Sequence, residues 1–342
     1  MSQTFMESHP KTHSRPVLVK RSMHELGELF IEALPTHIAN LKIPGRSITE
    51  QTRRPPLPAS IDNIEALQQT MHEVLCHPIT QQAQQHAESA FLLLLRKDST
   101  DSSTLRFFNG WNETHKTTSL VSAKVIMRLA ADAVSMPAHM QASHNTVMAH
   151  MHEVAKDDFG LGHKGHDGMY RYLTAVFGAS DWLEERYSVS ECLAFSEFLY
   201  NTGIAGHKAA MTSDEYREST MKAMMVSISS ELWNGREYNF LAQFIEQKLL
   251  CLDPTLNANP QALRNAKGYV MGHSGEVENR HGLHALAAAQ AFARMEDIDF
   301  DIPQLKKVML DYNERVGKAF GALAGFLAEA HDTDERSEKQ LA

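Results

Sequence analysis

The chain has 342 residues, of which 43% are hydrophobic and 22% charged, a composition typical of a globular protein with a substantial core. Its formal net charge of -9 and the lack of a long basic run argue against nucleic acid as the main partner. The three cysteines (Cys76, Cys192 and Cys251) form no CxxC pair, which excludes a cysteine-rich zinc or iron–sulfur site and predicts a reducing, cytoplasmic environment.

Residues 1–58 are expected to form an N-terminal extension. The stretch 23–34 has helical apolar spacing and stops at Pro35, and a Pro/Arg-rich linker (residues 53–58) follows it. Residues 1–16 lack the apolar core of a signal peptide. A helix carried on such a linker could mediate contacts in a homodimer.

Residues 59–331 predict a helical bundle. Ser60 is a plausible N-cap for the first helix, and apolar residues recur after it at steps of three and four. The further helices are expected at residues 80–96, 118–135, 137–158, 166–177, 180–200, 214–250, 260–296 and 303–330. No alternating strand pattern and no apolar run long enough to cross a membrane occur, so the predicted fold is all-α, with seven or more helices and a charged tail at 332–342.

The most informative motif lies late in the chain, between His273 and His284. Glu278, His281 and His284 are three residues apart, a spacing that places side chains on one face of a helix. A carboxylate and imidazoles beside an apolar stripe are costly to bury unless something compensates their charge. With 19 histidines and few cysteines, imidazole and carboxylate are the available ligands, which suits iron, manganese or zinc.

Two earlier segments offer further ligands. Acidic residues (Glu153, Asp157 and Asp158) end one predicted helix, a glycine pair turns the chain, and His166 begins the next helix. Glu231 interrupts a stretch of small and apolar residues. Metal sites in helical bundles are built from such inward-facing side chains on several helices.

Together these segments resemble the haem-oxygenase-like diiron oxidases and oxygenases, also described as iron-containing redox enzymes. The similarity covers about residues 120–295: an acid and glycine before a histidine that enters a helix, then a glutamate, then a histidine–acid–histidine motif. It implies a haem-oxygenase-like bundle and the metal ligands Asp158, His166, Glu231, His273, Glu278 and His281.

The sequence departs from the family pattern at two points. The family's first carboxylate is normally Glu, whereas Asp158 stands here, with Asp157 and Glu153 as alternates. The last motif usually places its acid four residues after the histidine, but here the gap is five. Either a π-bulge absorbs one residue, or Glu276 or His284 takes part instead.

The resemblance implies an oxidase or oxygenase with two irons and dioxygen as co-substrate, and manganese uses the same ligand types. Its substrate would be a small amino-acid-like or fatty-acid-like molecule, which undergoes N-oxygenation, oxidative C–C cleavage or desaturation in specialised-metabolite or cofactor biosynthesis. An external electron donor could take part.

Two alternatives stay open. In the first, the same scaffold is a metal-free oxidase in which His281 is a general base oriented by Glu278. In the second, the chain is a non-catalytic helical binding protein whose histidines lie on solvated helix faces.

Overall fold

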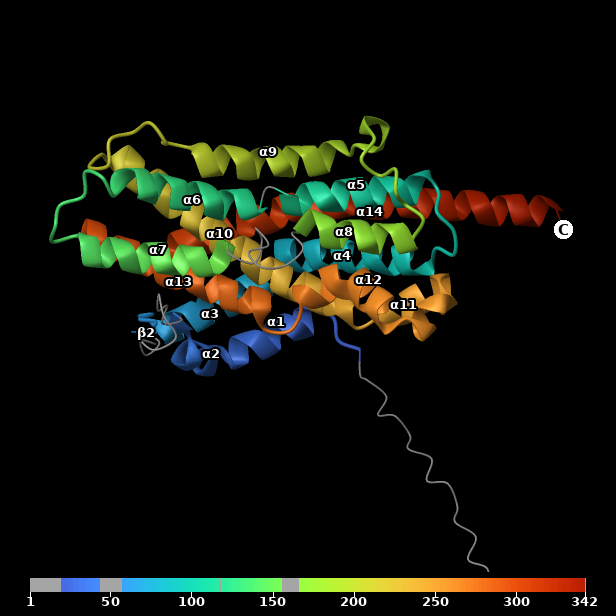
Figure 1. Cartoon of the computed structure of the whole chain (residues 1–342), viewed down its shortest axis with the longest axis horizontal. Coiled ribbons are helices and arrows are strands. Elements are labelled where there is room, and N and C mark those ends of the chain that lie inside the picture. Colours follow the sequence, from blue (N-terminus) through green and yellow to red (C-terminus); the bar gives the residue numbers. More distant parts are fainter. Residues whose placement is uncertain (1–19, 44–56, 117, 156–165, 342) are drawn as a thin grey trace, which may run out of the picture.

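The computed structural model of the protein describes residues 20–43, 57–116, 118–155 and 166–341, and these are almost entirely helical (Figure 1). The helices are α1 (Met23–Glu32), α2 (Leu34–Asn40), α3 (Ile64–Leu75), α4 (Pro78–Arg96), α5 (Ser102–Lys116), α6 (Thr118–Asp132), α7 (Gln141–Ala155), α8 (His166–Val176), α9 (Ser190–Ile204), α10 (Asp214–Ala242), α11 (Ile245–Leu252), α12 (Pro260–Gly272), α13 (Val277–Glu296) and α14 (Ile302–Leu341). The described strands are a two-residue antiparallel pair, β1 (Lys42–Ile43) with β2 (Leu57–Pro58). The all-α prediction is confirmed.

Helix α10 is the central element of the bundle. From Met221 to Leu241 nearly every side chain is buried, because α1, α6, α9, α12, α13 and α14 pack around it. A helix buried on all sides needs apolar or small residues around its whole circumference, and this stretch is mostly apolar or small, with three Met and three Ser. The three buried charged residues within it, Glu231, Arg236 and Glu237, are therefore exceptional.

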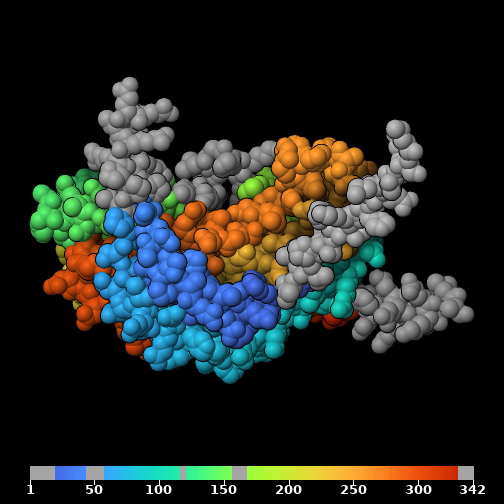
Figure 2. All heavy atoms as spheres, turned by 90° about the horizontal axis from the view of Figure 1, so that it is seen from below, coloured from blue at the N-terminus to red at the C-terminus, as the bar shows by residue number. Residues whose placement is uncertain are grey.

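The N-terminal helices belong to the same core as the rest of the bundle. Met23 and Leu34 are fully buried, and α1 contacts both α3 and α10. In Figure 2 the blue atoms of this segment cover one face of the molecule beside the orange atoms of the C-terminal half. The predicted helix over 23–34 is wrong at its end, since α2 continues past Pro35, which lies in the first turn of α2 where proline is tolerated.

Two predicted long helices are each two helices. The stretch 214–250 breaks near Phe244, between α10 and α11, and the stretch 260–296 breaks between α12 and α13. At the second break Gly275 has φ +74°, a left-handed conformation that glycine adopts without steric cost. His273 therefore ends α12 and does not share a helix with Glu278 and His281, which corrects the prediction of a single continuous motif.

Several helix starts also differ from prediction. Helix α3 begins after Asn63, in the left-handed region, and not after Ser60. Helix α7 begins at Gln141, four residues after Pro137, and α9 begins at Ser190 after a 3-10 turn at Glu185–Tyr187. In the part of the chain that the structure describes, no helix is long and apolar enough to cross a membrane.

Helix α5 was absent from the predicted helices. Its start is fixed by Asp101, whose Oδ1 accepts a hydrogen bond from the backbone N–H of Thr104 at 2.9 Å, and it buries Phe107, Phe108 and Trp111. Burial opposes ionisation of Asp101, but hydrogen bonds from Lys97, Ser103 and Thr104 outweigh it and lower the pKa of the carboxyl group to about 2.

Substituting Asp101→Ala is expected to destabilise the protein by about 1 kcal/mol at pH 7, because α5 loses its N-cap. A carboxyl whose pKa is depressed on folding stabilises the folded state above its unfolded pKa and loses that contribution as the pH falls towards its folded pKa. The difference between wild type and variant in urea unfolding should therefore be constant above about pH 5 and shrink between about pH 5 and pH 2. An undiminished difference across that range would contradict this explanation.

Candidate metal centre

The crossing of α10 and α13 is unusually close, and two glycines allow it. A Cβ atom at Gly282 would lie 2.7 Å from Cδ2 of Leu232, and one at Gly235 would lie 2.3 Å from Oδ1 of Asn279. Real Cβ atoms do not approach other atoms this closely, so an added side chain at either position would force the side chain of Leu232 or Asn279 to shift. The same hypothetical Cβ at Gly282 would lie 3.5 Å from Cβ of Glu231, which shows how near this contact is to the charged residues.

Three ionisable side chains meet at this crossing. Glu231 comes from α10, and Glu278 and His281 come from the first turns of α13. Nδ1 of His281 lies 3.5 Å from Oε2 of Glu278 and 3.7 Å from Oε2 of Glu231. One potential ligand atom from each residue lies within 4.8 Å of the others, and none of the three residues is more than 2% exposed. We call these three residues the Glu231 cluster.

The separations in the Glu231 cluster fit ligands around an ion better than hydrogen bonds. Nitrogen–oxygen hydrogen bonds are commonly about 2.7–3.2 Å long, shorter than both of these separations. An ion with bonds of about 2.1 Å holds neighbouring ligand atoms about 3.0–3.4 Å apart, and opposite ones about 4.2 Å apart. In addition, Oε1 of Glu278 has no hydrogen-bond partner among the described residues, a costly state for a buried carboxylate oxygen.

The electrostatics favour the ionised form of the Glu278 carboxyl group. Burial raises the pKa of Glu278, but its close approach to the imidazoles of His281 and His273 and to the side chain of Glu231 outweighs burial, so the pKa is lowered overall. Metal ligands must be deprotonated, and Glu278 meets that requirement at neutral pH. Two ionised carboxylates and a neutral imidazole would carry a net negative charge in a dry core, which a cation would neutralise.

His273 lies next to the Glu231 cluster but is not part of it. It is the C-cap of α12, its Nδ1 contacts the carbonyl oxygen of Tyr269 at 2.5 Å, and its ring stacks on Tyr238 with centroids 4.8 Å apart. Burial lowers its pKa, although the charge of Glu278 opposes this, so the imidazole is neutral at pH 7. Its electrostatic interaction with Glu278 places it beside the cluster.

Helix α7 brings a second pair of imidazoles to α13. Nδ1 of His150 lies 2.9 Å from Nδ1 of His284, so one ring donates a hydrogen bond and the other accepts it. Burial lowers the pKa of His150 to about 4, against the opposing charge of Glu153, which is itself buried. His284 and Glu153 were alternates in the sequence analysis, whereas His150 was missed; the signal was its spacing of three residues from Glu153.

The other predicted ligands fall into two groups. Asp157 and Asp158 lie outside the described residues, as does the side chain of His166, the first residue of α8. Glu276 is exposed at the N-cap of α13 and takes no part in the Glu231 cluster. Of the proposed set, the structure thus brings Glu231, Glu278 and His281 together.

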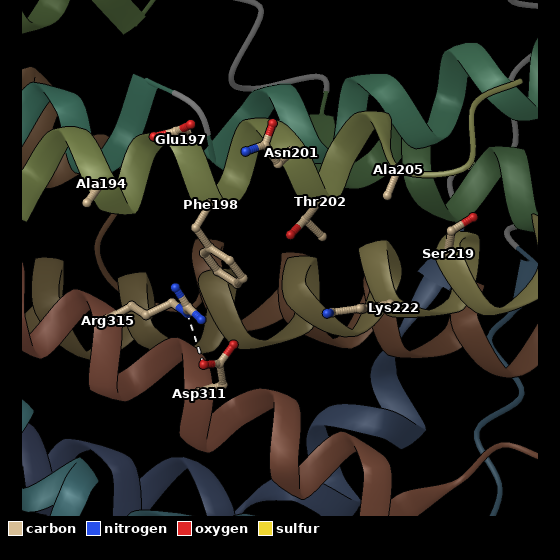
Figure 3. A pocket seen from close by; sticks show the side chains of 10 residues that line it. All are labelled: Ala194, Glu197, Phe198, Asn201, Thr202, Ala205, Ser219, Lys222, Asp311 and Arg315. Carbon is tan, nitrogen blue, oxygen red and sulfur yellow. Dashed lines mark hydrogen bonds and ion pairs between the residues drawn. The ribbon is translucent and has the colours of Figure 1, made fainter. Parts of the chain in front are cut away.

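A hollow of about 480 Å³ opens at the surface between α9, α10 and α14 (Figure 3). Lys222 points into it, and Arg315 pairs with Asp311 at 2.9 Å while lying over the ring of Phe198. None of its lining residues belongs to the Glu231 cluster. This hollow and the buried cluster are therefore separate features of α10.

Comparison of the chain with protein-family models, with curated proteins and with solved structures found no match.

Adding one methyl group at Gly282 should separate α10 from α13. We expect Gly282→Ala to destabilise the protein by about 1–3 kcal/mol, because its Cβ would overlap the side chain of Leu232. The matched control is Gly325→Ala, a helical glycine with nothing within 4 Å of the added Cβ, which should raise stability by about 0.5–1 kcal/mol. Urea denaturation of both variants tests this, and equal behaviour of the two would contradict the close-crossing account.

Proposed function

We propose that the chain is a non-haem iron oxidoreductase that activates dioxygen at a metal centre built on the Glu231 cluster. The observation that carries the proposal is the burial of two carboxylates and an imidazole with ligand-like spacing and a carboxylate oxygen that lacks a hydrogen-bond partner among the described residues. The resemblance to the haem-oxygenase-like diiron oxidases and oxygenases supports iron as the metal. Manganese is accommodated by the same ligand types.

The candidate ligands form two groups, one for each of two ions. Glu231, Glu278 and His281 would hold one ion. His284, His150 and Glu153, one helical turn further along the α13–α7 contact, would serve a second ion together with the Asp158 and His166 expected from the resemblance. When bound, the iron pair would supply the electrons that reduce dioxygen.

The surroundings would keep water away from this chemistry. Leu232 and Leu283 flank the Glu231 cluster on α10 and α13 and are 6% and 1% exposed. A dry site strengthens the electrostatic interaction between the carboxylates and a cation. Glu231 and Glu278 both face Nδ1 of His281, and they would fix the orientation of its imidazole ring.

The substrate class follows from the resemblance alone. We propose a small amino-acid-like or fatty-acid-like molecule, converted by N-oxygenation, oxidative C–C cleavage or desaturation in a biosynthetic pathway, with an external electron donor closing the cycle.

A metal-free reaction is the second candidate. Here His281 would be a general base and Glu278 would orient it, which the 3.5 Å separation of the two side chains favours. The two candidates differ in one measurable property, since only the first requires iron.

The first candidate is tested by anaerobic loading of the full-length protein with Fe(II), followed by measurement of protein-bound iron and of oxygen consumption. We expect iron binding in the wild type, and a loss of affinity on the order of tenfold or more in Glu231→Gln and in His281→Gln, because each removes a ligand. The matched control is Glu276→Gln, an exposed glutamate of the same helix, which should bind iron like the wild type.

Less than about half an iron atom per chain in the wild type would favour the metal-free candidate. Unchanged iron binding in both ligand variants would contradict the assignment of the Glu231 cluster.

A further inference from the structure

A second buried carboxylate on α10 is held by three nitrogen atoms. Oε1 of Glu237 accepts a hydrogen bond from Nε1 of Trp111 at 2.7 Å and lies 2.8 Å from Nε2 of His115, while Oε2 accepts one from Nε1 of Trp233 at 2.6 Å. All four side chains are buried. Glu237 follows Glu231 by six residues on the same helix, which corresponds to about 9 Å along the axis.

Trp111 also belongs to a continuous run of oxidisable rings. Tyr238 stacks on His273, beside the Glu231 cluster, and its ring centroid lies 6.2 Å from that of Trp111. Trp111 lies 5.5 Å from Tyr170, which in turn lies 5.1 Å from Trp182. Trp182 is 5% exposed and is followed in the chain by Leu183, which is 57% exposed, so the run leads from beside the candidate metal centre towards the surface.

Trp111 differs from the two tyrosines of this run because its Nε1 proton is donated to a carboxylate, that of Glu237. An indole that loses an electron becomes a strong N–H acid and is stabilised when a base within hydrogen-bond reach takes the proton. The hydroxyl of Tyr238 donates to that of Tyr269, and the hydroxyl of Tyr170 donates to the backbone carbonyl of Phe108; both acceptors are weak bases. Burial raises the pKa of both Tyr238 and Tyr170, so neither ionises beforehand.

Trp233 also donates a hydrogen bond to Glu237, but a nearby positive charge makes its ring harder to oxidise. The guanidinium of the buried Arg236 lies 5.4 Å from the centroid of the Trp233 ring. Burial lowers the pKa of Arg236 to about 10, so it still carries its positive charge at pH 7. A cation over an aromatic ring stabilises the neutral ring and opposes removal of an electron from it.

We propose that Trp111 and Glu237 form a redox relay, in which Trp111 is the residue of this chain that is oxidised by one electron. Trp111 gives one electron to a one-electron oxidant at the candidate metal centre, the class of species that oxygen activation there would supply. Its Nε1 proton passes to Oε1 of Glu237, which leaves a neutral indolyl radical and a carboxylic acid. An electron from an external donor, entering by Trp182 and Tyr170, and return of the proton restore both residues.

The oxidant in this scheme rests on the proposed function, but the oxidation site can be tested without it. The test oxidises the metal-free, full-length protein with photogenerated tris(bipyridine)ruthenium(III), frozen at once for electron paramagnetic resonance. Since the chain has three tryptophans, single Trp→Phe variants assign any indolyl radical. We expect the radical in the wild type and in Trp233→Phe, and its loss in Trp111→Phe.

Trp233→Phe is the matched control, because it removes the same group from the same carboxylate. If Trp111→Phe does not fold, as judged by circular dichroism, the spectrum of the wild-type radical is the test. Its coupling to exchangeable protons should be that of an indole nitrogen that accepts a hydrogen bond from a protonated carboxyl group. A radical on Trp233, one confined to Trp182, or one that keeps its N–H proton would overturn the proposal. A Trp111 radical formed by light but not by iron and dioxygen would uphold the oxidation site and count against the proposed oxidase function.

Discussion

The tight contact between α10 and α13 is the constraint on which the rest of the structure depends. Gly235 and Gly282 remove the side chains that would separate the two helices, and Glu231, Glu278 and His281 then face one another in a core almost without solvent. Charged groups in such a place are costly unless hydrogen bonds or a cation compensate them. A sequence that keeps two carboxylates there gives up stability that an apolar core would supply.

Three groups of buried polar side chains are arranged along α10 and α13. The Glu231 cluster lies at the crossing, the imidazoles of His150 and His284 lie further along α13, and Glu237 with its nitrogen donors lies further along α10. Each group is contributed by at least two helices, so the packing that buries them also aligns them. The surface hollow of Figure 3 lies against a different part of α10, and within it Arg315 pairs with Asp311.

Local patterns in the sequence predicted much of this arrangement, and the parts they missed depend on tertiary structure. The three-residue spacing of Glu278 and His281 and the isolated charge of Glu231 placed these residues among the six ligands expected from the sequence. The break at Gly275, which moves His273 to another helix, depends on a left-handed conformation that helical periodicity does not reveal. The pairs His150–His284 and Glu237–Trp111 were missed because their members lie 134 and 126 residues apart in sequence and meet only across packed helices.

The central claim is that an ion binds where Glu231, Glu278 and His281 converge. Anomalous X-ray diffraction at the iron absorption edge, from crystals of the iron-loaded protein, locates such an ion directly. The account predicts a peak at bonding distance, about 2.0–2.2 Å, from one ligand atom of each of the three residues. Iron-loaded crystals with no peak there, or with iron bound only at exposed histidines, would contradict it.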